Sequence, residues 1–132
     1  MTTPAHVHRL RVRWSEVDAQ GVVFNPNYFV YADVAATEFL RANGILAHLN
    51  EELQQIFAVD ARAAFRGSAR FDDELDIHVR TARIGRSSFA LDIGIHRQER
   101  PLTEVVLTYA RAIDGVAVPL SEDFRTRLGQ PA

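Results

Sequence analysis

The sequence predicts an α+β domain in which an antiparallel sheet of about five strands wraps around one long central helix, with a short C-terminal helix. Three observations predict this fold. Apolar and polar residues alternate with a period of two in several segments, as in strands with one buried face. One long segment is apolar on most sides, as expected of a helix surrounded by other structure. The strand segments follow one another directly, which favours antiparallel pairing.

Composition limits the classes of protein to which the chain can belong. Its 132 residues, 47% hydrophobic and 24% charged, indicate a single globular domain over residues 1–132. The absence of cysteine excludes disulfides, a thiolate nucleophile and cysteine-ligated metals. All 15 basic residues are arginines, which excludes Schiff-base and P-loop lysines.

Charge and hydropathy indicate the expected partners and location. A net charge of −2 is unlike the basic excess of nucleic-acid-binding proteins. No apolar run is long enough for a signal-peptide core or a membrane span. We therefore expect a cytoplasmic protein with no nucleic-acid or membrane partner.

The N-terminal part of the sequence predicts a strand followed by an acidic loop. Over residues 8–14, apolar residues alternate with arginines and end at Trp14. Residues 15–25 lose this alternation and contain two carboxylates, Glu16 and Asp18. The loop therefore places acidic groups directly after the first strand.

The long helix is expected to begin at Asn25-Pro26 and to run to about Asn43. Asparagine can cap free amides at a helix start, and proline suits the first helical position because it needs no donor there. Gly44 can adopt the left-handed conformation that commonly follows a helix.

The rest of the chain predicts four strands and a short helix. Residues 45–55 form a polar helical or looped connection. Pro119 and Ser121 open the C-terminal helix, whose first turn is acidic. The expected strands lie at 56–65, 75–80, 89–96 and 102–113, with a hairpin turn at 84–87 and a break at 99–101.

Two common kinds of catalytic site lack support in the sequence. The five histidines form no close metal-ligand pattern, so we expect no metal site. None of the five serines lies in a GxSxG motif, which speaks against a serine hydrolase.

The segment from Arg13 to Tyr28 places a carboxylate, Asp18, seven residues before a helix start. Free amides at a helix start can polarise a carbonyl oxygen, and a nearby carboxylate can attack that carbonyl or deprotonate a water. Gly21 between them allows close approach of the backbone to a ligand. These are the parts of a hydrolytic site, although a merely solvated Asp18 is also compatible with this spacing.

The stretch DAQGVVFNPNYFVYADVAATEFLRANGI, residues 18–45, resembles the signature of the hotdog-fold acyl-CoA thioesterases of the 4-hydroxybenzoyl-CoA thioesterase family. The resemblance implies a hotdog fold and a catalytic Asp18, acting as nucleophile or general base. It also implies that the backbone amide of Asn25 polarises the thioester carbonyl. No cofactor is implied, because coenzyme A is part of the substrate. A homodimer or homotetramer is implied, with active sites at the subunit interface.

The same resemblance suggests which residues bind the substrate. Arg83, Arg86 and Ser87 resemble the region that holds the nucleotide end of coenzyme A, and arginines suit its phosphates; Arg97 and Arg100 flank the next turn. Trp14, Phe24 and Tyr28 could line an acyl pocket, although isolated aromatics are more often core residues. Asn25 stands where relatives often carry an aromatic residue or histidine, which implies a differently shaped pocket. Around Asp18, the candidates for substrate contact are Gly21, Val22, Phe24, Pro26, Asn27 and Tyr28.

Several alternatives stay open. Some hotdog thioesterases use a helix carboxylate, for which Glu38 is a candidate unless it simply pairs with Arg41. Glu16 has at most a supporting role. The domain could instead be a non-catalytic acyl-ligand binding or assembly module. A hydratase would be expected to carry a histidine in loop 15–27, which has none. The acyl group, and whether its carrier is coenzyme A or a protein, are left open.

Overall fold

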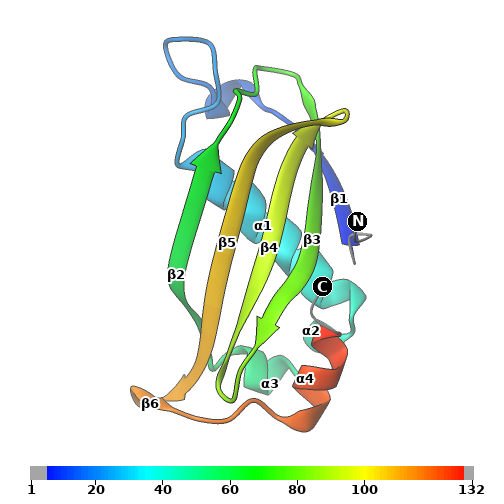
Figure 1. Ribbon diagram of the computed structural model, residues 1–132, viewed down its shortest axis with the longest axis vertical. Helices are drawn as coiled ribbons and strands as arrows, with labels where there is room; N and C mark the ends of the chain where they lie inside the picture. Colours follow the sequence, from blue (N-terminus) through cyan, green and yellow to red (C-terminus); the bar gives the residue numbers. More distant parts are fainter. Residues whose placement is uncertain (1–5, 130–132) are drawn as a thin grey trace.

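A computed structural model describes residues 6–129 and shows one antiparallel sheet curled around a single long helix (Figure 1). The spatial order of the strands is β1-β3-β4-β5-β2, and β6 pairs with β5. The strands are β1 (His6–Arg11), β2 (Ile56–Phe65), β3 (Glu74–Ile84), β4 (Ser88–Arg97), β5 (Arg100–Ile113) and β6 (Val116–Ala117). The helices are α1 (Asn27–Ala42), α2 (Ile45–His48), α3 (Asn50–Leu53) and α4 (Glu122–Leu128), with a 3-10 helix at Trp14–Glu16. The predicted α+β class is confirmed.

The core lies between α1 and the concave face of the sheet. Small residues on the buried side of the helix, among them Ala32 and Ala35, let it approach the strands closely. The apolar residues of β3 and β4 alternate with polar ones and point to the helix, as the period of two predicts. Those with at most 2% exposure are Leu75, Ile77, Val79, Phe89, Leu91, Ile93 and Ile95.

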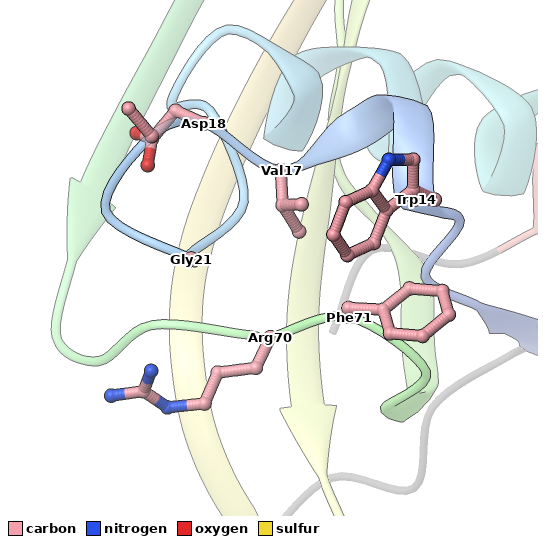
Figure 2. Close-up of a pocket in the computed structure, with 7 residues that line it drawn as sticks. Trp14, Val17, Asp18, Gly21, Arg70 and Phe71 are labelled. Carbon is pink, nitrogen blue, oxygen red and sulfur yellow. The ribbon is translucent and has the colours of Figure 1, made fainter.

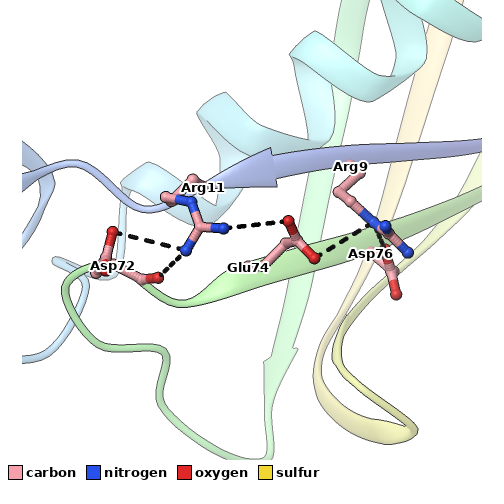
Figure 3. Close-up of polar contacts among 5 residues, drawn as sticks. All are labelled: Arg9, Arg11, Asp72, Glu74 and Asp76. Carbon is pink, nitrogen blue, oxygen red and sulfur yellow. Dashed lines mark hydrogen bonds and ion pairs between the residues drawn. The ribbon is translucent and has the colours of Figure 1, made fainter.

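Ion pairs on the convex face hold β1 against β3 (Figure 3). Arg9 donates to the Asp76 carboxylate at 2.8 Å. Arg11 donates to the Glu74 carboxylate at 3.3 Å and to the Asp72 carbonyl oxygen at 2.8 Å. Both arginine side chains are mostly exposed, so each pair adds little to stability. Because Arg9 and Arg11 pair with the residues directly opposite them, the charges favour this register over a one-residue slip.

The first strand differs from its predicted range. It ends at Arg11 rather than at Trp14, because Val12 leaves the ladder to bond the main chain at the Asp73 carbonyl. The 3-10 helix follows at once. Trp14 is therefore 74% exposed instead of pointing into the sheet.

The start of α1 also differs from prediction. The helix begins at Asn27, and the Asn25 side chain caps nothing within residues 6–129. Main-chain bonds of the tighter i to i+3 kind form the entry turn instead. The Asn27 amide donates to Phe24, and the Tyr28 amide donates to Asn25. Gly44 has the expected left-handed conformation, with φ of 80°.

The remaining elements agree with prediction in kind and differ at their ends. β2 has the predicted range, β3 and β4 are longer, and β5 begins earlier, at Arg100. β6 was not predicted, although Asp114 and Gly115, with φ of 51° and 79°, form a turn of the kind that favours a hairpin. Ser121 caps α4 as expected, accepting from the Phe124 amide at 3.1 Å.

Strand β2 occupies one edge of the sheet and is open to solvent. It pairs only with β5 among the described strands. Phe57, Val59 and Phe65 are 54%, 60% and 47% exposed. A ten-residue edge with exposed apolar side chains is a surface that other chains can pair with.

Helices that could span a membrane are absent from residues 6–129.

Candidate active site

The acidic loop folds as a small hairpin in front of α1. Val17 and Val23 form an isolated antiparallel bridge, and the Asp18 amide donates to the Val22 carbonyl at 2.9 Å. The Gly21 amide closes the turn by donating to the Asp18 carbonyl at 3.0 Å. Gly21 has φ of 79°, a value that favours glycine. The main chain therefore fixes the position of Asp18 on the hairpin.

One oxygen of the Asp18 carboxylate accepts a hydrogen bond, and the other is free to bind a ligand. Oδ1 accepts a hydrogen bond from the Gln20 amide at 2.8 Å, which orients the carboxylate. Within residues 6–129, Oδ2 accepts no hydrogen bond and forms no ion pair. Asp18 is partly exposed. This oxygen is consequently available to a substrate or a water.

Glu16 lies at the base of the same loop with its side chain 12% exposed. Burial by itself would raise the pKa of Glu16. Hydrogen bonds from the Arg13 amide, the Tyr31 hydroxyl and the Arg13 guanidinium outweigh burial and lower that pKa. Burial, followed by the bond to Glu16, raises the pKa of Tyr31, so the phenol keeps its proton.

A shallow depression of about 620 Å³ opens beside Asp18 (Figure 2). Trp14 and Phe71 form its aromatic side and meet edge to face, with ring centroids 5.3 Å apart. The guanidinium of Arg70 forms no hydrogen bond or ion pair with the residues that the structure describes. The lining consists of Trp14, Val17, Asp18, Ala19, Gly21, Arg70 and Phe71.

The 66–73 segment completes this depression. The Val23 amide donates to the Ala69 carbonyl at 2.9 Å, and Val22 bridges to Arg70. The contribution of Arg70 and Phe71 was not predicted, because they lie more than 50 residues from Asp18 in a stretch without periodicity. Only the tertiary fold brings them to the loop.

The residues predicted at the helix start have different environments. The Asn25 amide has no hydrogen-bond acceptor within residues 6–129. Phe24 is 55% exposed and Pro26 is also exposed. Asn27 donates its side-chain amide to the Glu16 carbonyl at 2.9 Å. Tyr28 is 1% exposed and lies in the core, as isolated aromatics more often do.

Tyr28 supports the wall of the depression from inside. Its hydroxyl accepts a hydrogen bond from the buried Ala69 amide at 3.0 Å. Burial outweighs that bond and raises the pKa of Tyr28. Arg97 acts nearby, donating to the Ser68 carbonyl and to the Asp73 carboxylate at 3.1 Å and 2.9 Å. Both residues hold the 66–73 segment in place.

The predicted nucleotide-binding residues lie at the opposite end of the sheet. Arg83, Arg86 and Ser87 are at the β3–β4 turn, whereas the loop that carries Asp18 bridges to Arg70, shortly before the other end of β3. β3 has 11 residues. At about 3.3 Å per residue its ends are roughly 35 Å apart. A single chain does not bring these residues to Asp18.

The remaining candidates lie outside the depression. Glu38 accepts a hydrogen bond from Arg41 at 3.0 Å, which lowers the pKa of Glu38 and supports the ion-pair interpretation. Arg100 is exposed at the start of β5. No group of three or more histidines and carboxylates that could hold a metal gathers within residues 6–129.

Comparisons with known proteins identify the family. The family model described as the thioesterase superfamily matches residues 20–104. A gentisyl-coenzyme A thioesterase of known structure is 25% identical, with a TM-score of 0.82, covering 94% of this chain and 100% of that one.

Two further solved structures are similar in fold. A thioesterase from Thermus thermophilus, complexed with coenzyme A and Zn, is 21% identical, with a TM-score of 0.84 and 100% coverage of both chains. A 4-hydroxybenzoyl-CoA thioesterase mutant, complexed with 4-hydroxybenzoyl-CoA, is 19% identical, with a TM-score of 0.84, covering 94% of this chain and 98% of that one. With a hotdog fold and a family match over residues 20–104, the chain belongs to the thioesterase superfamily and is a thioester hydrolase.

Proposed function

We propose that the protein hydrolyses acyl-CoA thioesters, with Asp18 as the catalytic carboxylate and the Asn25 amide as the donor to the thioester carbonyl. The observation that carries this proposal is the pairing, on one short loop, of an open carboxylate oxygen and an unbonded main-chain amide. An amide already fixed in the turn that leads into a helix stabilises a developing oxyanion without reorganisation. The relatives that act on or bind coenzyme A thioesters support the substrate class.

Two routes are compatible with this arrangement. In the nucleophilic route, an Asp18 oxygen bonds to the carbonyl carbon, the carbon–sulfur bond breaks, and water then hydrolyses the mixed anhydride. In the general-base route, Asp18 takes a proton from water as the water attacks, and the proton then passes to the departing thiolate. Both routes release a free acid and a thiol. Both place the negative charge on the carbonyl oxygen near the Asn25 amide.

The walls of the depression suit an apolar acyl group. Trp14 and Phe71 offer an aromatic surface within the same depression as Asp18. The named relatives with gentisyl and 4-hydroxybenzoyl substrates make aromatic acyl groups the first to test. Short, medium and long aliphatic chains belong in the same panel.

A second copy of the chain is part of the proposal. Arg83, Arg86 and Ser87 can hold the nucleotide end of the substrate at Asp18 only if a second copy supplies them, given their distance along β3. The open edge strand β2 offers a surface for such pairing. Light scattering across a concentration series tests whether the protein is a monomer or a dimer or tetramer.

The decisive experiment compares thiol release by wild type and Asp18→Asn over the acyl-CoA panel. The amide retains the oxygen that accepts from Gln20 and removes the base and nucleophile. We expect a loss of turnover of about a hundredfold or more with folding intact. Asp123→Asn, which removes a carboxylate paired with Arg127 on α4, is the matched control and should retain activity.

Equal release by wild type and Asp18→Asn would contradict the role of Asp18. No release from any substrate would favour a non-catalytic acyl-binding module.

A further inference from the structure

Glu16 joins both ends of the loop that carries Asp18. Its carboxylate accepts from the Arg13 amide at 2.7 Å, from the Arg13 guanidinium at 3.0 Å and from the Tyr31 hydroxyl at 2.9 Å. Its carbonyl oxygen accepts from the Phe24 amide at 3.0 Å and from the Asn27 side chain at 2.9 Å. One residue therefore contacts the chain before the loop, the chain after it and the buried face of α1.

The carbonyl contact determines where the Asn25 amide lies. The Phe24 amide is bound to Glu16, and the next amide along the chain is the unbonded one of Asn25. The two amides belong to consecutive planar peptide units joined at the Phe24 Cα, so only the φ and ψ angles of Phe24 separate their orientations. Asp18 lies two residues after Glu16, on the arm of the hairpin opposite Phe24. Glu16 thus connects the arm of the hairpin that leads to Asp18 with the residue directly before Asn25.

The carboxylate contact anchors this arrangement to the core. Tyr31 is 2% exposed and belongs to the buried face of α1. A hydrogen bond to an ionised acceptor is stronger than one between neutral groups. A capping-box contact at the 3-10 helix explains the bond from the Arg13 amide, and an ion pair explains the bond from the Arg13 guanidinium. Neither contact requires the bonds from Tyr31 and Asn27, which tie Glu16 to the helix that follows the loop.

We propose that Glu16 is a positioning residue that holds the Asp18 carboxylate and the Asn25 amide in register by tying the base of their loop to α1. The consequence for catalysis rests on the proposed function. The consequence for loop geometry does not, and it can be measured without any substrate.

Amide hydrogen exchange tests the geometry. Glu16→Ala should lower the protection of the Asp18, Gly21 and Phe24 amides about tenfold or more relative to Asp123→Asn, while the β3–β4 amides keep theirs. Tyr31→Phe removes one bond to Glu16 and should produce the same local loss of protection to a smaller extent. This variant replaces Glu16→Ala in the test if Glu16→Ala does not fold. Unchanged loop protection, or equal loss throughout the sheet, would overturn the proposal.

Kinetics test the consequence for catalysis. We expect Glu16→Ala to lower kcat by about 10- to 100-fold with a much smaller change in KM, because misplaced groups lose transition-state stabilisation. Glu16→Gln retains an acceptor for Tyr31 and should recover part of the lost kcat. A selective rise in KM, or no rescue by Glu16→Gln, would contradict the positioning role. Absence of thiol release by wild type would contradict the proposed function and leave the exchange result standing on its own.

Discussion

The Tyr31 hydroxyl donates to Glu16 Oε1 at 2.9 Å and so links the buried face of α1 to the loop that precedes it. Tyr31→Phe removes only this bond. We expect a loss of about 1–2 kcal/mol in the free energy of unfolding, because the acceptor is charged and mostly buried. Urea denaturation of both proteins measures the difference. A change below about 0.5 kcal/mol would show that the Arg13 bonds alone hold Glu16.

Stability in acid should depend on Glu16. Its pKa is lowered in the folded protein, so its contribution is fully present above the unfolded pKa and is lost as pH falls through the folded one. The stability advantage of wild type over Glu16→Gln should therefore be constant near neutral pH. It should shrink below the ordinary glutamate pKa of about 4.3. Denaturation series at several pH values test this. An advantage that grows in acid would contradict the assigned hydrogen bonds.

The Tyr28 hydroxyl should matter for stability although Tyr28 is buried away from the surface. Tyr28→Phe leaves the buried Ala69 amide without its acceptor, which costs about 1–3 kcal/mol. Tyr109→Phe is the matched control, since the Tyr109 hydroxyl has no hydrogen bond with the residues described. Thermal and urea denaturation should separate the two variants. Equal effects would argue against the Tyr28–Ala69 bond.

Gly21 offers a test that separates backbone strain from activity. Gly21 and Gly115 both have φ of 79°, and an added Cβ would meet nothing within 4 Å at either. Each substitution by alanine should cost about 1–2 kcal/mol through the left-handed conformation alone. Gly21→Ala should also lower kcat/KM, because its methyl group borders the depression beside Asp18. Gly115→Ala should leave kcat/KM unchanged. Equal kcat/KM for both variants would place the substrate elsewhere.

The role proposed for Asn25 belongs to its main chain. Asn25→Ala keeps the amide and removes a side chain that caps nothing in the described part of the chain. We expect kcat within about threefold of wild type, against a loss of about a hundredfold for Asp18→Asn. Steady-state kinetics on the best acyl-CoA decide this. A large loss in Asn25→Ala would assign a role to the side chain instead.

Local patterns sufficed for most of the fold. Strict alternation in β3 and β4 and the glycine at position 44 predicted strands and a helix end that the structure contains. The first strand was extended too far because the alternation continues through Trp14. The chain leaves the sheet there for a tertiary reason, the bonds between Val12 and the turn before β3. The helix start was placed too early because asparagine and proline mark an entry turn as readily as a helix.

The site could be predicted only in part, because some of its residues come together only through the tertiary fold. Asp18 and Gly21 are close in sequence, and the structure keeps them on one hairpin. Arg70 and Phe71 line the same depression because the folded chain brings the 66–73 segment beside the loop, a contact that local periodicity does not reveal. The role of Glu16 depends on Tyr31, fifteen residues later, so its importance becomes visible only once α1 is packed.

The length of β3 has a consequence for measurements at low enzyme concentration. If the arginines of the β3–β4 turn bind the substrate at the Asp18 site of a second chain, dilution separates the chains and removes the contacts with the nucleotide end of the substrate. Each separated chain keeps its own Asp18 loop. Dilution should then raise KM for acyl-CoA thioesters. It should leave the rates of truncated thioesters that lack the nucleotide unchanged. The ratio of the rate on acyl-CoA thioesters to the rate on truncated thioesters therefore measures the association of chains without any mutation.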